Sequence, residues 1–259
     1  MTRCDDAITA KGIAMETKPY FSRFAQLCVA ALILMAVSSG AAHAQSASIT
    51  VGKLFTNSGT CSASVISSNN IIVTAGHCCW NRTTNAWIGG WSFAPGYNKG
   101  NAPYGTFNWA DARVLNSWIN NGDIASDVCL IKMQNDSAGH PLTYYTGWFG
   151  RAWNFPAQQN MTAFGYPGNI GNANNLESCA AQSSAQPASC GSGVLNMACI
   201  MTYGSSGGPW IKDYGAGDHV NATVHGYSGP ACGTPFGQAF NGPQFTSNNI
   251  AALCTAEGC

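Results

Sequence analysis

The chain is built from short runs rich in β-branched and aromatic residues, separated by clusters of glycine, asparagine, serine and proline. Long runs with helical periodicity are scarce. Many short strands with turn residues between them are typical of a β-sandwich or a β-barrel. The expected strands are residues 48–55, 62–66, 71–74, 106–109, 127–133, 161–166, 194–201, 210–212 and 222–227. The sequence therefore predicts an all-β fold.

Two segments between these runs are expected to be long surface loops, residues 81–105 and residues 167–193. Residues 245–253 are expected to end the chain with a short helix. A division near residues 137–147 separates two halves of similar length. We therefore expect one β-domain over residues 45–140 and a second over residues 141–259.

The first 44 residues have the layout of a secretory signal peptide. Lys18 and Arg23 precede an apolar stretch at residues 27–37, and small residues follow up to Ala42-His43-Ala44. This stretch is shorter than the roughly 20 residues that span a bilayer. An uncleaved membrane anchor is the alternative. We expect residues 1–44 to be removed and the protein to be secreted or periplasmic.

Ten cysteines follow the expected cleavage site. An even number of cysteines in an exported chain indicates up to five disulfides. The alternative is a zinc site, because His77, Cys78 and Cys79 are consecutive. Consecutive residues do not readily converge on one tetrahedral ion, and the chain contains no C-x-x-C motif. We therefore expect no metal and no other cofactor.

The charge of the same part of the chain is nearly balanced, with seven Lys and Arg and eight Asp and Glu. No basic stripe is present that would neutralise phosphates, so nucleic-acid binding is not expected. No charged amphipathic helix is present either, so we expect no membrane binding after signal cleavage. We also expect the protein to be a monomer.

Ser206 lies in the string Gly204-Ser205-Ser206-Gly207-Gly208-Pro209. A serine nucleophile needs a base for its proton and backbone N–H groups for the developing oxyanion. The flanking glycines permit the unusual backbone turn that such a site requires. We expect the N–H groups of Gly204 and Ser206 to form the oxyanion hole. A plain Gly/Ser turn is the alternative.

His77 and Asp127 are the candidates for base and orienting acid. His77 directly follows an apolar strand, and Asp127 opens another one. An acid at the start of a buried strand needs a hydrogen-bond donor, which the ring of His77 can supply. Asp123 is the competing acid, and we prefer Asp127 because the apolar strand follows it directly.

The order His77, Asp127, Ser206 and the strings T-A-G-H-C, D-V-C-L-I and G-S-S-G-G-P resemble the chymotrypsin-like (trypsin-like) serine peptidases. Further strings resemble the V8-like branch of glutamyl endopeptidases within that family; they lie at residues 93–98, 103–105, 164–168, 224–226 and 241–243. The resemblance implies two perpendicular six-stranded antiparallel β-barrels with the active site in the cleft between them.

The resemblance also implies a function. A secreted serine endopeptidase would hydrolyse peptides or proteins through an acyl-enzyme formed on Ser206, with His77 as base and Asp127 as its support. The alternatives are a catalytically silent two-barrel pseudoprotease and an exported, disulfide-rich binding module.

An expectation for substrate specificity follows from the same resemblance. His225 matches the residue that contacts an acidic side chain before the scissile bond (the P1 residue), and Thr202 can bond the same carboxylate; the alternative is that His225 only packs beside the site. The disulfide pairings are separate hypotheses. Cys61–Cys78 would fix the histidine loop. Cys79 and Cys129 are unusual for the family, and because each follows a catalytic candidate by two residues, a Cys79–Cys129 disulfide would tie base to acid. The remaining expected pairs are Cys199–Cys232, which would brace the pocket, Cys179–Cys190 and Cys254–Cys259.

Overall fold

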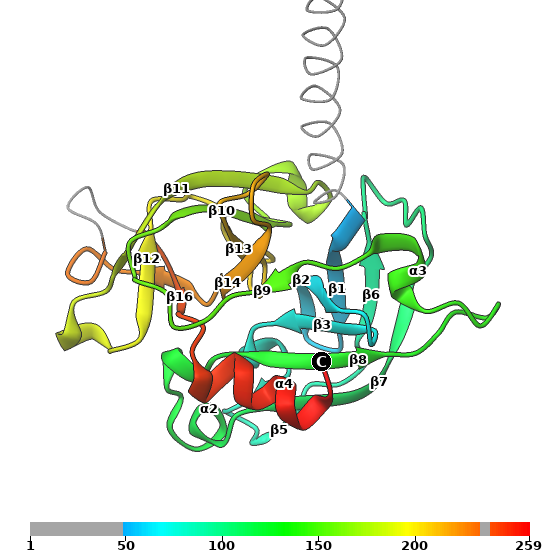
Figure 1. The fold of residues 1–259 in the computed structure, drawn as a ribbon, viewed down its shortest axis with the longest axis horizontal. Helices are drawn as coiled ribbons and strands as arrows, with labels where there is room; N and C mark the ends of the chain where they lie inside the picture. The colour runs from blue at the N-terminus through cyan, green and yellow to red at the C-terminus, as the bar shows by residue number, and fades with distance from the viewer. Residues whose placement is uncertain (1–48, 234–238) are drawn as a thin grey trace, which may run out of the picture. The chain divides into compact units, whose positions relative to one another are not determined.

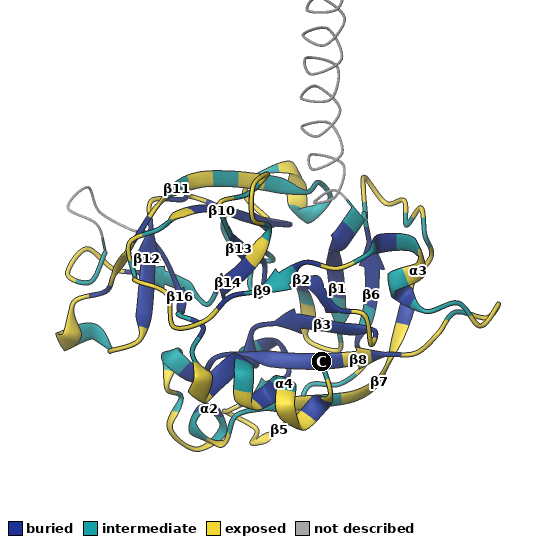
Figure 2. Ribbon diagram, viewed as in Figure 1, coloured by how far each residue is buried: buried dark blue, intermediate teal, exposed yellow. Residues whose placement is uncertain are grey.

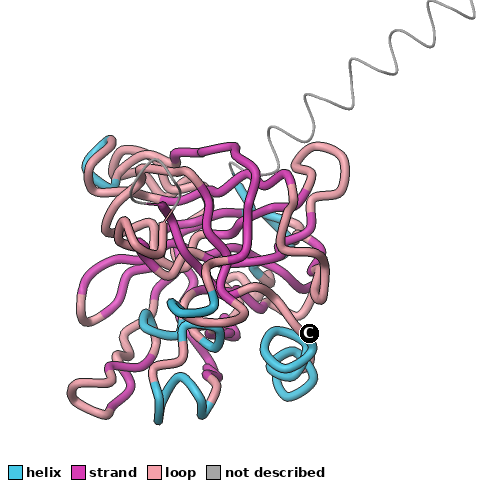
Figure 3. Tube along the Cα trace, turned by 90° about the vertical axis from the view of Figure 1, so that its left-hand side faces the viewer, coloured by secondary structure: helices cyan, strands magenta, loops and turns pink. Residues whose placement is uncertain are grey.

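The computed structural model describes residues 49–233 and 239–259. The expected signal peptide, residues 1–44, lies outside the described residues. Strands dominate the described part of the chain (Figures 1 and 3), so the expectation of an all-β fold is confirmed. Within the described residues, no helix is both long enough and apolar enough to cross a bilayer.

Six antiparallel strands form a closed barrel in the first half of the described chain. Around the barrel, the order of the strands is β1 (Val51–Thr56), β2 (Gly59–Ser67), β3 (Ile71–Thr74), β8 (Cys129–Met133), β7 (Phe107–Val114) and β6 (Ser92–Pro95). β6 pairs with β1 and closes the barrel. A small hairpin of β4 (Trp80–Asn81) and β5 (Ala86–Trp87) lies outside it.

The second half forms an eight-stranded sheet that curls back on itself. Its order is β15 (Gly226–Ser228), β16 (Ala239–Pro243), β12 (Val194–Met197), β11 (Glu177–Ala185), β10 (Asn160–Gly165), β13 (Pro209–Lys212), β14 (His219–Thr223) and β9 (Gly150–Arg151). Ala222 of β14 forms a bridge with Gln244, just beyond β16, and so joins the two sides of the curled sheet. The two-barrel fold is therefore confirmed, with two additions in the second barrel: β15 at one edge and β9, parallel to β14, at the other.

Helical segments are short. They are η1 (Gly76–Cys78), α2 (Asn116–Asn121), η2 (Ile124–Ser126), α3 (Leu142–Thr146), η3 (Gly171–Ala173), η4 (Ala188–Cys190), the π-turn η5 (Ser247–Ala251) and α4 (Ala252–Glu257). The expected C-terminal helix is present but begins later than residue 245. Thr246 caps η5 through its Oγ1, which accepts from the N–H of Asn248 at 3.3 Å, so extended chain continues as far as Thr246.

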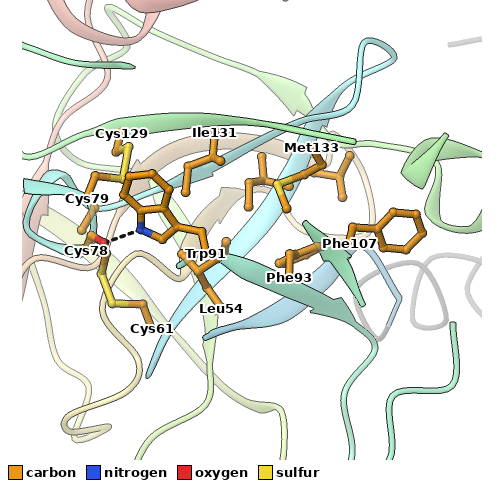
Figure 4. Close-up of a cluster of buried hydrophobic side chains, with 14 of the residues drawn as sticks. Leu54, Cys61, Cys78, Cys79, Trp91, Phe93, Phe107, Cys129, Ile131 and Met133 are labelled. Atoms are coloured by element: carbon orange, nitrogen blue, oxygen red, sulfur yellow. Dashed lines mark hydrogen bonds between the residues drawn. A yellow bond between two sulfur atoms is a disulfide. The ribbon is translucent and has the colours of Figure 1, made fainter. Parts of the chain in front are cut away.

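Most strand residues are buried (Figure 2), and the buried apolar side chains form three clusters. One fills the first barrel and includes Trp91, whose indole N–H donates to the carbonyl of Cys78 at 3.0 Å (Figure 4). A second fills the second barrel around Trp210 and Phe240. The third lies between the barrels and combines Val73, Leu130, Phe164, Tyr166, Ile211, Ile250 and Leu253, among others.

The three clusters explain the composition of the central strands. In β3, Ile71 and Val73 belong to the cluster between the barrels, whereas Ile72 belongs to the interior of the first barrel. Successive side chains of a strand point to opposite faces. Because both faces of β3 are buried, the strand is apolar throughout rather than alternating, and it was recognisable from its sequence.

The two segments expected to be loops both contain strands. β6 lies within residues 81–105, and the nine-residue β11 lies within residues 167–193. The residues of β11 are mostly small or polar, with little intrinsic preference for a strand. β11 is a strand because it pairs with β10 on one side and β12 on the other.

The disulfides agree with three of the expected pairings and correct two. Cys61–Cys78, Cys79–Cys129 and Cys254–Cys259 are formed. The expected pairs Cys199–Cys232 and Cys179–Cys190 are wrong, because the structure has Cys179–Cys199 and Cys190–Cys232 instead. The unrecognised strand is the reason, since the antiparallel pairing of β11 with β12 carries Cys179 close to Cys199.

We predict that the buried disulfide Cys79–Cys129 contributes more to stability than the C-terminal one. The sequence separations are 50 and 5 residues, so loop-closure entropy gives about 4 kcal/mol for the first and about 2 kcal/mol for the second. The test is denaturant unfolding of the double variants Cys79→Ala/Cys129→Ala and Cys254→Ala/Cys259→Ala. Equal losses in the two variants would contradict this ranking.

Candidate active site

The ends of two neighbouring strands bring His77 and Asp127 together. β3 and β8 are antiparallel, and Thr74 at the end of β3 lies opposite Cys129 at the start of β8. His77 follows β3 in the short turn η1, and Asp127 directly precedes β8. The Cys79–Cys129 disulfide joins the two segments again two residues further along.

Asp127 is fully buried, and its carboxylate accepts hydrogen bonds from His77 at both oxygens. The ring Nδ1–H of His77 donates to Oδ2 at 2.8 Å, and the backbone N–H of His77 donates to Oδ1 at 2.6 Å. With Nδ1 carrying the proton, Nε2 of a neutral His77 is free to accept one. The alternative acid Asp123 instead caps η2, where it accepts from Ala125 and Ser126.

Charge and burial shift the pKa values of this pair in opposite directions. Burial alone lowers the pKa of His77, but the charge and hydrogen bond of Asp127 outweigh burial and leave it raised. Burial alone raises the pKa of Asp127, but His77 and a hydrogen bond from His225 outweigh burial and leave it lowered. The carboxylate therefore remains ionised, and His77 is a stronger base than a free imidazole.

A second imidazole reaches the same carboxylate. Nδ1 of His225 lies 2.5 Å from Oδ2 of Asp127, so Oδ2 accepts from both histidines. The two rings meet edge to face, with centroids 5.4 Å apart. The Trp118 ring lies against both of them, 6.3 Å from His77 and 6.0 Å from His225. The expectation for His225 was a contact with substrate, and its bond to the acid was not foreseen.

The loop that carries Ser206 is enclosed by both barrels, and its glycines are required by close contacts. Gly204 and Gly207 have φ values of +95° and +78°, in the region that favours glycine. A Cβ on Gly204 would lie 2.4 Å from the carbonyl oxygen of Tyr166. A Cβ on Gly207 would lie 2.0 Å from Oγ1 of Thr74, in the first barrel.

Ser62 of β2 holds the same loop in place and had no recognisable signal in the sequence. Its backbone N–H donates to the carbonyl of Ser206 at 2.7 Å, and its hydroxyl donates to the carbonyl of Gly204 at 2.8 Å. The hydroxyl also accepts from the N–H of Tyr166 at 2.9 Å. One buried serine of the first barrel thus positions three residues of the second.

The expected oxyanion donors have free N–H groups. The N–H of Ser205 donates to the carbonyl of Thr202, and that of Gly207 donates to Val224. By contrast, the N–H groups of Gly204, which precedes Ser205, and of Ser206, which lies between these two residues, make no hydrogen bond to any described residue. Two such donors on a glycine-rich turn can stabilise a negatively charged oxygen.

A single cleft of about 530 Å³ brings the expected site residues together. Its lining includes His77, Thr202, Gly204, Ser206 and His225. The first half of the chain also contributes Thr56, Ile88 and residues 58–61 to the lining. The side chains of His77 and His225 are 30% and 24% exposed, so both can meet a ligand in the cleft.

Thr202 is already engaged. Its hydroxyl donates to Oδ1 of Asn169 at 2.9 Å and accepts from the N–H of Asn169 at 3.0 Å. The backbone N–H of Thr202 also donates to Oδ1 of Asn169, at 2.8 Å. The hydroxyl proton of Thr202 can therefore reach a substrate only if the bond to Asn169 breaks.

Among the described residues, two groups of side chains have the composition of a metal site. In the first, with His77, the cysteines Cys61 and Cys78 form a disulfide and offer no thiolate. Cys79, the other cysteine of the zinc alternative, is likewise bonded, to Cys129. The second is the cluster of His77, Asp127 and His225, whose ligand atoms lie within 4.8 Å of one another. There, hydrogen bonds from the two Nδ1–H groups account for the spacing without an ion.

Comparisons with known proteins find similarity to serine proteases. A family model described as Trypsin matches residues 37–240. The thermostable serine protease AL20 from an extremophilic microorganism is 30% identical, with a TM-score of 0.71 over 82% of this chain and 98% of that one. Protease Anisep from Arthrobacter nicotinovorans is 26% identical, with a TM-score of 0.69. The match covers 81% of this chain and 96% of that one.

Two further similarities are more limited. A Glu endopeptidase solved in complex with MPD is 18% identical, with a TM-score of 0.65 over 81% of this chain and 91% of that one, a similarity of fold. An extracellular metalloprotease of Bacillus subtilis (strain 168) is 33% identical over 81 residues. That match spans 31% of this chain and 24% of the curated relative.

We predict that the pKa of His77 falls when Asp127 is changed to Asn. The variant removes the charge that raises the pKa while keeping a side chain of the same size. The measurement is an NMR titration of the His77 ring. Asp123→Asn is the matched control, because Asp123 lies four residues earlier and bonds only within η2. An unchanged His77 titration in Asp127→Asn would remove Asp127 from the site.

Proposed function

Since the chain belongs to the trypsin family, we propose that it is a serine endopeptidase that acts outside the cell or in the periplasm, as a monomer, on peptides and proteins. The observation that carries this proposal is that His77, hydrogen-bonded to the buried Asp127, lines one cleft together with Ser206. The five disulfides support an oxidising compartment.

The proposed reaction proceeds in two stages. Oγ of Ser206 attacks the scissile carbonyl while Nε2 of His77 takes its proton; the C–N bond then breaks, and His77 gives that proton to the leaving amine. Water repeats the sequence on the acyl-enzyme ester, which releases the acid and regenerates Ser206. Asp127 keeps Nδ1 of His77 as the donor and stabilises the imidazolium that forms in each stage.

Two features of the site support this chemistry. The raised pKa of His77 makes it a better proton acceptor for the serine hydroxyl. The free N–H groups of Gly204 and Ser206 are available for the oxygen that becomes negative, and loss of one such donor typically costs about 3 kcal/mol of transition-state stabilisation.

We also propose a preference for Glu or Asp at P1, read by His225. A carboxylate that enters the cleft loses hydration and needs donors in return. The Nδ1–H of His225 is committed to Asp127, so its donor to the substrate is Nε2, which requires a second proton on the ring. Thr202 contributes less than expected, because its hydroxyl proton is shared with Asn169.

We predict that Ser206→Ala abolishes labelling by a fluorophosphonate probe and lowers kcat by roughly 10⁶-fold. The measurements are labelling of the disulfide-bonded protein and hydrolysis of a casein or peptide substrate. Ser58→Ala is the matched control, because Ser58 also lines the cleft. A folded wild-type protein that neither labels nor cleaves would indicate the silent two-barrel alternative.

We predict that the preference for Glu over Gln at P1 falls in His225→Ala. The two side chains have the same shape, and only the charged one loses a partner when the imidazole is removed. The measurement is the ratio of kcat/KM for two peptides that differ at P1 alone. An equal ratio in the wild-type protein and in His225→Ala would refute the role of His225 in the acidic preference and leave the triad unaffected.

A further inference from the structure

Lys53 is a buried lysine with no carboxylate partner. It is 6% exposed, and its neighbours on the same face of β1 are Val51 and Phe55, since alternate residues of a strand share a face. None of the ion pairs among the described residues includes Lys53. Removal of an ammonium from water without a counter-ion is costly, so this lysine needs contacts that compensate for the lost hydration.

Two aromatic rings and one carbonyl surround this ammonium. Nζ lies 4.8 Å from the ring centroid of Tyr97 and 5.4 Å from that of Phe55, within the range of cation–π attraction. Nζ also donates to the carbonyl of Ala173 at 2.7 Å. Burial lowers the pKa of Lys53, as expected for a cation in a low dielectric. The side chain of a first-barrel lysine is therefore committed to Ala173, which lies between β10 and β11 of the second barrel.

Ala173 belongs to the support loop, residues 167–174, and its backbone conformation is one that alanine rarely adopts. Asn172 and Ala173 in η3 have φ values of +52° and +56°. These values lie in the left-handed region, which costs free energy for residues other than glycine. The N–H of Ala173 donates to the carbonyl of Pro167 at 2.9 Å, and its carbonyl accepts from Lys53. Hydrogen bonds on both sides of Ala173 therefore stabilise this conformation.

The support loop packs directly against the nucleophile loop, residues 202–208. The N–H of Gly168, near the start of the support loop, donates to the carbonyl of Tyr203 at 2.6 Å. Near its end, Ala173 lies beside Gly204, since a Cβ on Gly204 would be 3.5 Å from the Cβ of Ala173. The position of the support loop therefore determines where Gly204, an expected oxyanion donor, lies.

Ser62 holds the other end of the support loop from the neighbouring strand. Lys53 of β1 lies directly opposite Ser62 of β2, so the two side chains share one face of the sheet. The hydroxyl of Ser62 accepts from the N–H of Tyr166, which precedes the support loop, and donates to the carbonyl of Gly204. Lys53 binds Ala173 near the end of the loop. Two adjacent polar side chains of the first barrel therefore hold both ends of the support loop.

We propose that Lys53 is a positioning residue for the oxyanion hole. Through the carbonyl of Ala173 it fixes the support loop, and the support loop fixes Gly204, so that the N–H groups of Gly204 and Ser206 stay in place for one developing oxyanion. Lys53 does not line the cleft, so it acts only through these contacts. The effect on the oxyanion hole rests on the proposed function, whereas the order of the support loop is a property of the folded protein alone.

The variant Lys53→Met removes the ammonium and nearly keeps the length of the side chain. We expect kcat to fall roughly 10- to 100-fold and KM to stay within about threefold, because a displaced oxyanion donor weakens an interaction made mainly in the transition state. Lys99→Met is the matched control, since the N–H of Lys99 donates to Asn174 of the support loop while its side chain is exposed. An unchanged kcat in Lys53→Met, or an equal loss in Lys99→Met, would overturn the proposal.

A glycine at position 173 tests the route through Ala173. Glycine adopts a φ value of +56° at little cost, so the support loop then depends less on the hydrogen bond from Lys53. We expect kcat of the double variant Lys53→Met/Ala173→Gly to exceed that of Lys53→Met by about threefold or more. No recovery of kcat would contradict the route through Ala173.

Amide hydrogen exchange tests the order of the support loop without activity. The N–H groups of Gly168 and Ala173 are both hydrogen-bonded, and their protection should fall about tenfold or more in Lys53→Met and stay at the wild-type value in Lys99→Met. Unchanged protection in Lys53→Met would refute the positioning role. If the wild-type protein neither labels nor cleaves, the proposed function fails, and hydrogen exchange still decides whether Lys53 orders the loop.

Tyr97→Leu is a second variant, which leaves Lys53 in place and serves if Lys53→Met does not fold. It removes the nearer of the two rings beside the ammonium and keeps the backbone carbonyl of residue 97, which accepts from the hydroxyl of Tyr166. We expect kcat and the protection of the Ala173 N–H both to fall several-fold. Wild-type values of both would overturn the proposal.

Discussion

A carboxylate with no exposure to solvent stands at the centre of this structure. Asp127 is stable in its ionised form only because N–H groups surround it, and these come from segments that are far apart in the sequence. His77 arrives from the end of β3, and His225 from the connection between β14 and β15. Every element that carries them must be in register before the charge can be buried. The antiparallel pairing of β3 with β8 and the adjacent disulfide meet this requirement in the first barrel.

The nucleophile loop depends on the opposite barrel in the same way. Ser62 binds the carbonyls of Gly204 and Ser206 from β2, and Thr74 fills the space beside Gly207. In the second barrel, Val224 holds the loop from the other side. The two halves of the candidate site are therefore not independent modules placed face to face, because each barrel supplies contacts that shape the residues of the other.

Much of the fold could be predicted from the sequence where burial imposes a pattern. β3 is apolar on both faces, and β8 is apolar except for Lys132, so His77 and Asp127, which lie next to these strands, stood out. β11 could not be recognised, since its small and polar residues become a strand only through their neighbours, and two disulfide pairings were wrong as a consequence. The bond from His225 to Asp127 and the engagement of Thr202 by Asn169 join residues 98 and 33 positions apart, and nothing in the local sequence records such contacts.

The apolar cluster between the barrels contains residues from nearly the whole described chain, from Val51 to Leu253. Ile250 and Leu253 cover β8 through η5 and α4, and they follow all other members of that cluster along the chain. During synthesis the chain emerges from its N-terminal end. The part of this cluster that Ile250 and Leu253 cover therefore lacks that cover until residues through Leu253 have been synthesised. A nascent chain of this sequence can close its first barrel early, whereas the cleft also needs the second barrel and is complete only after Phe240, the last of its lining residues along the described chain.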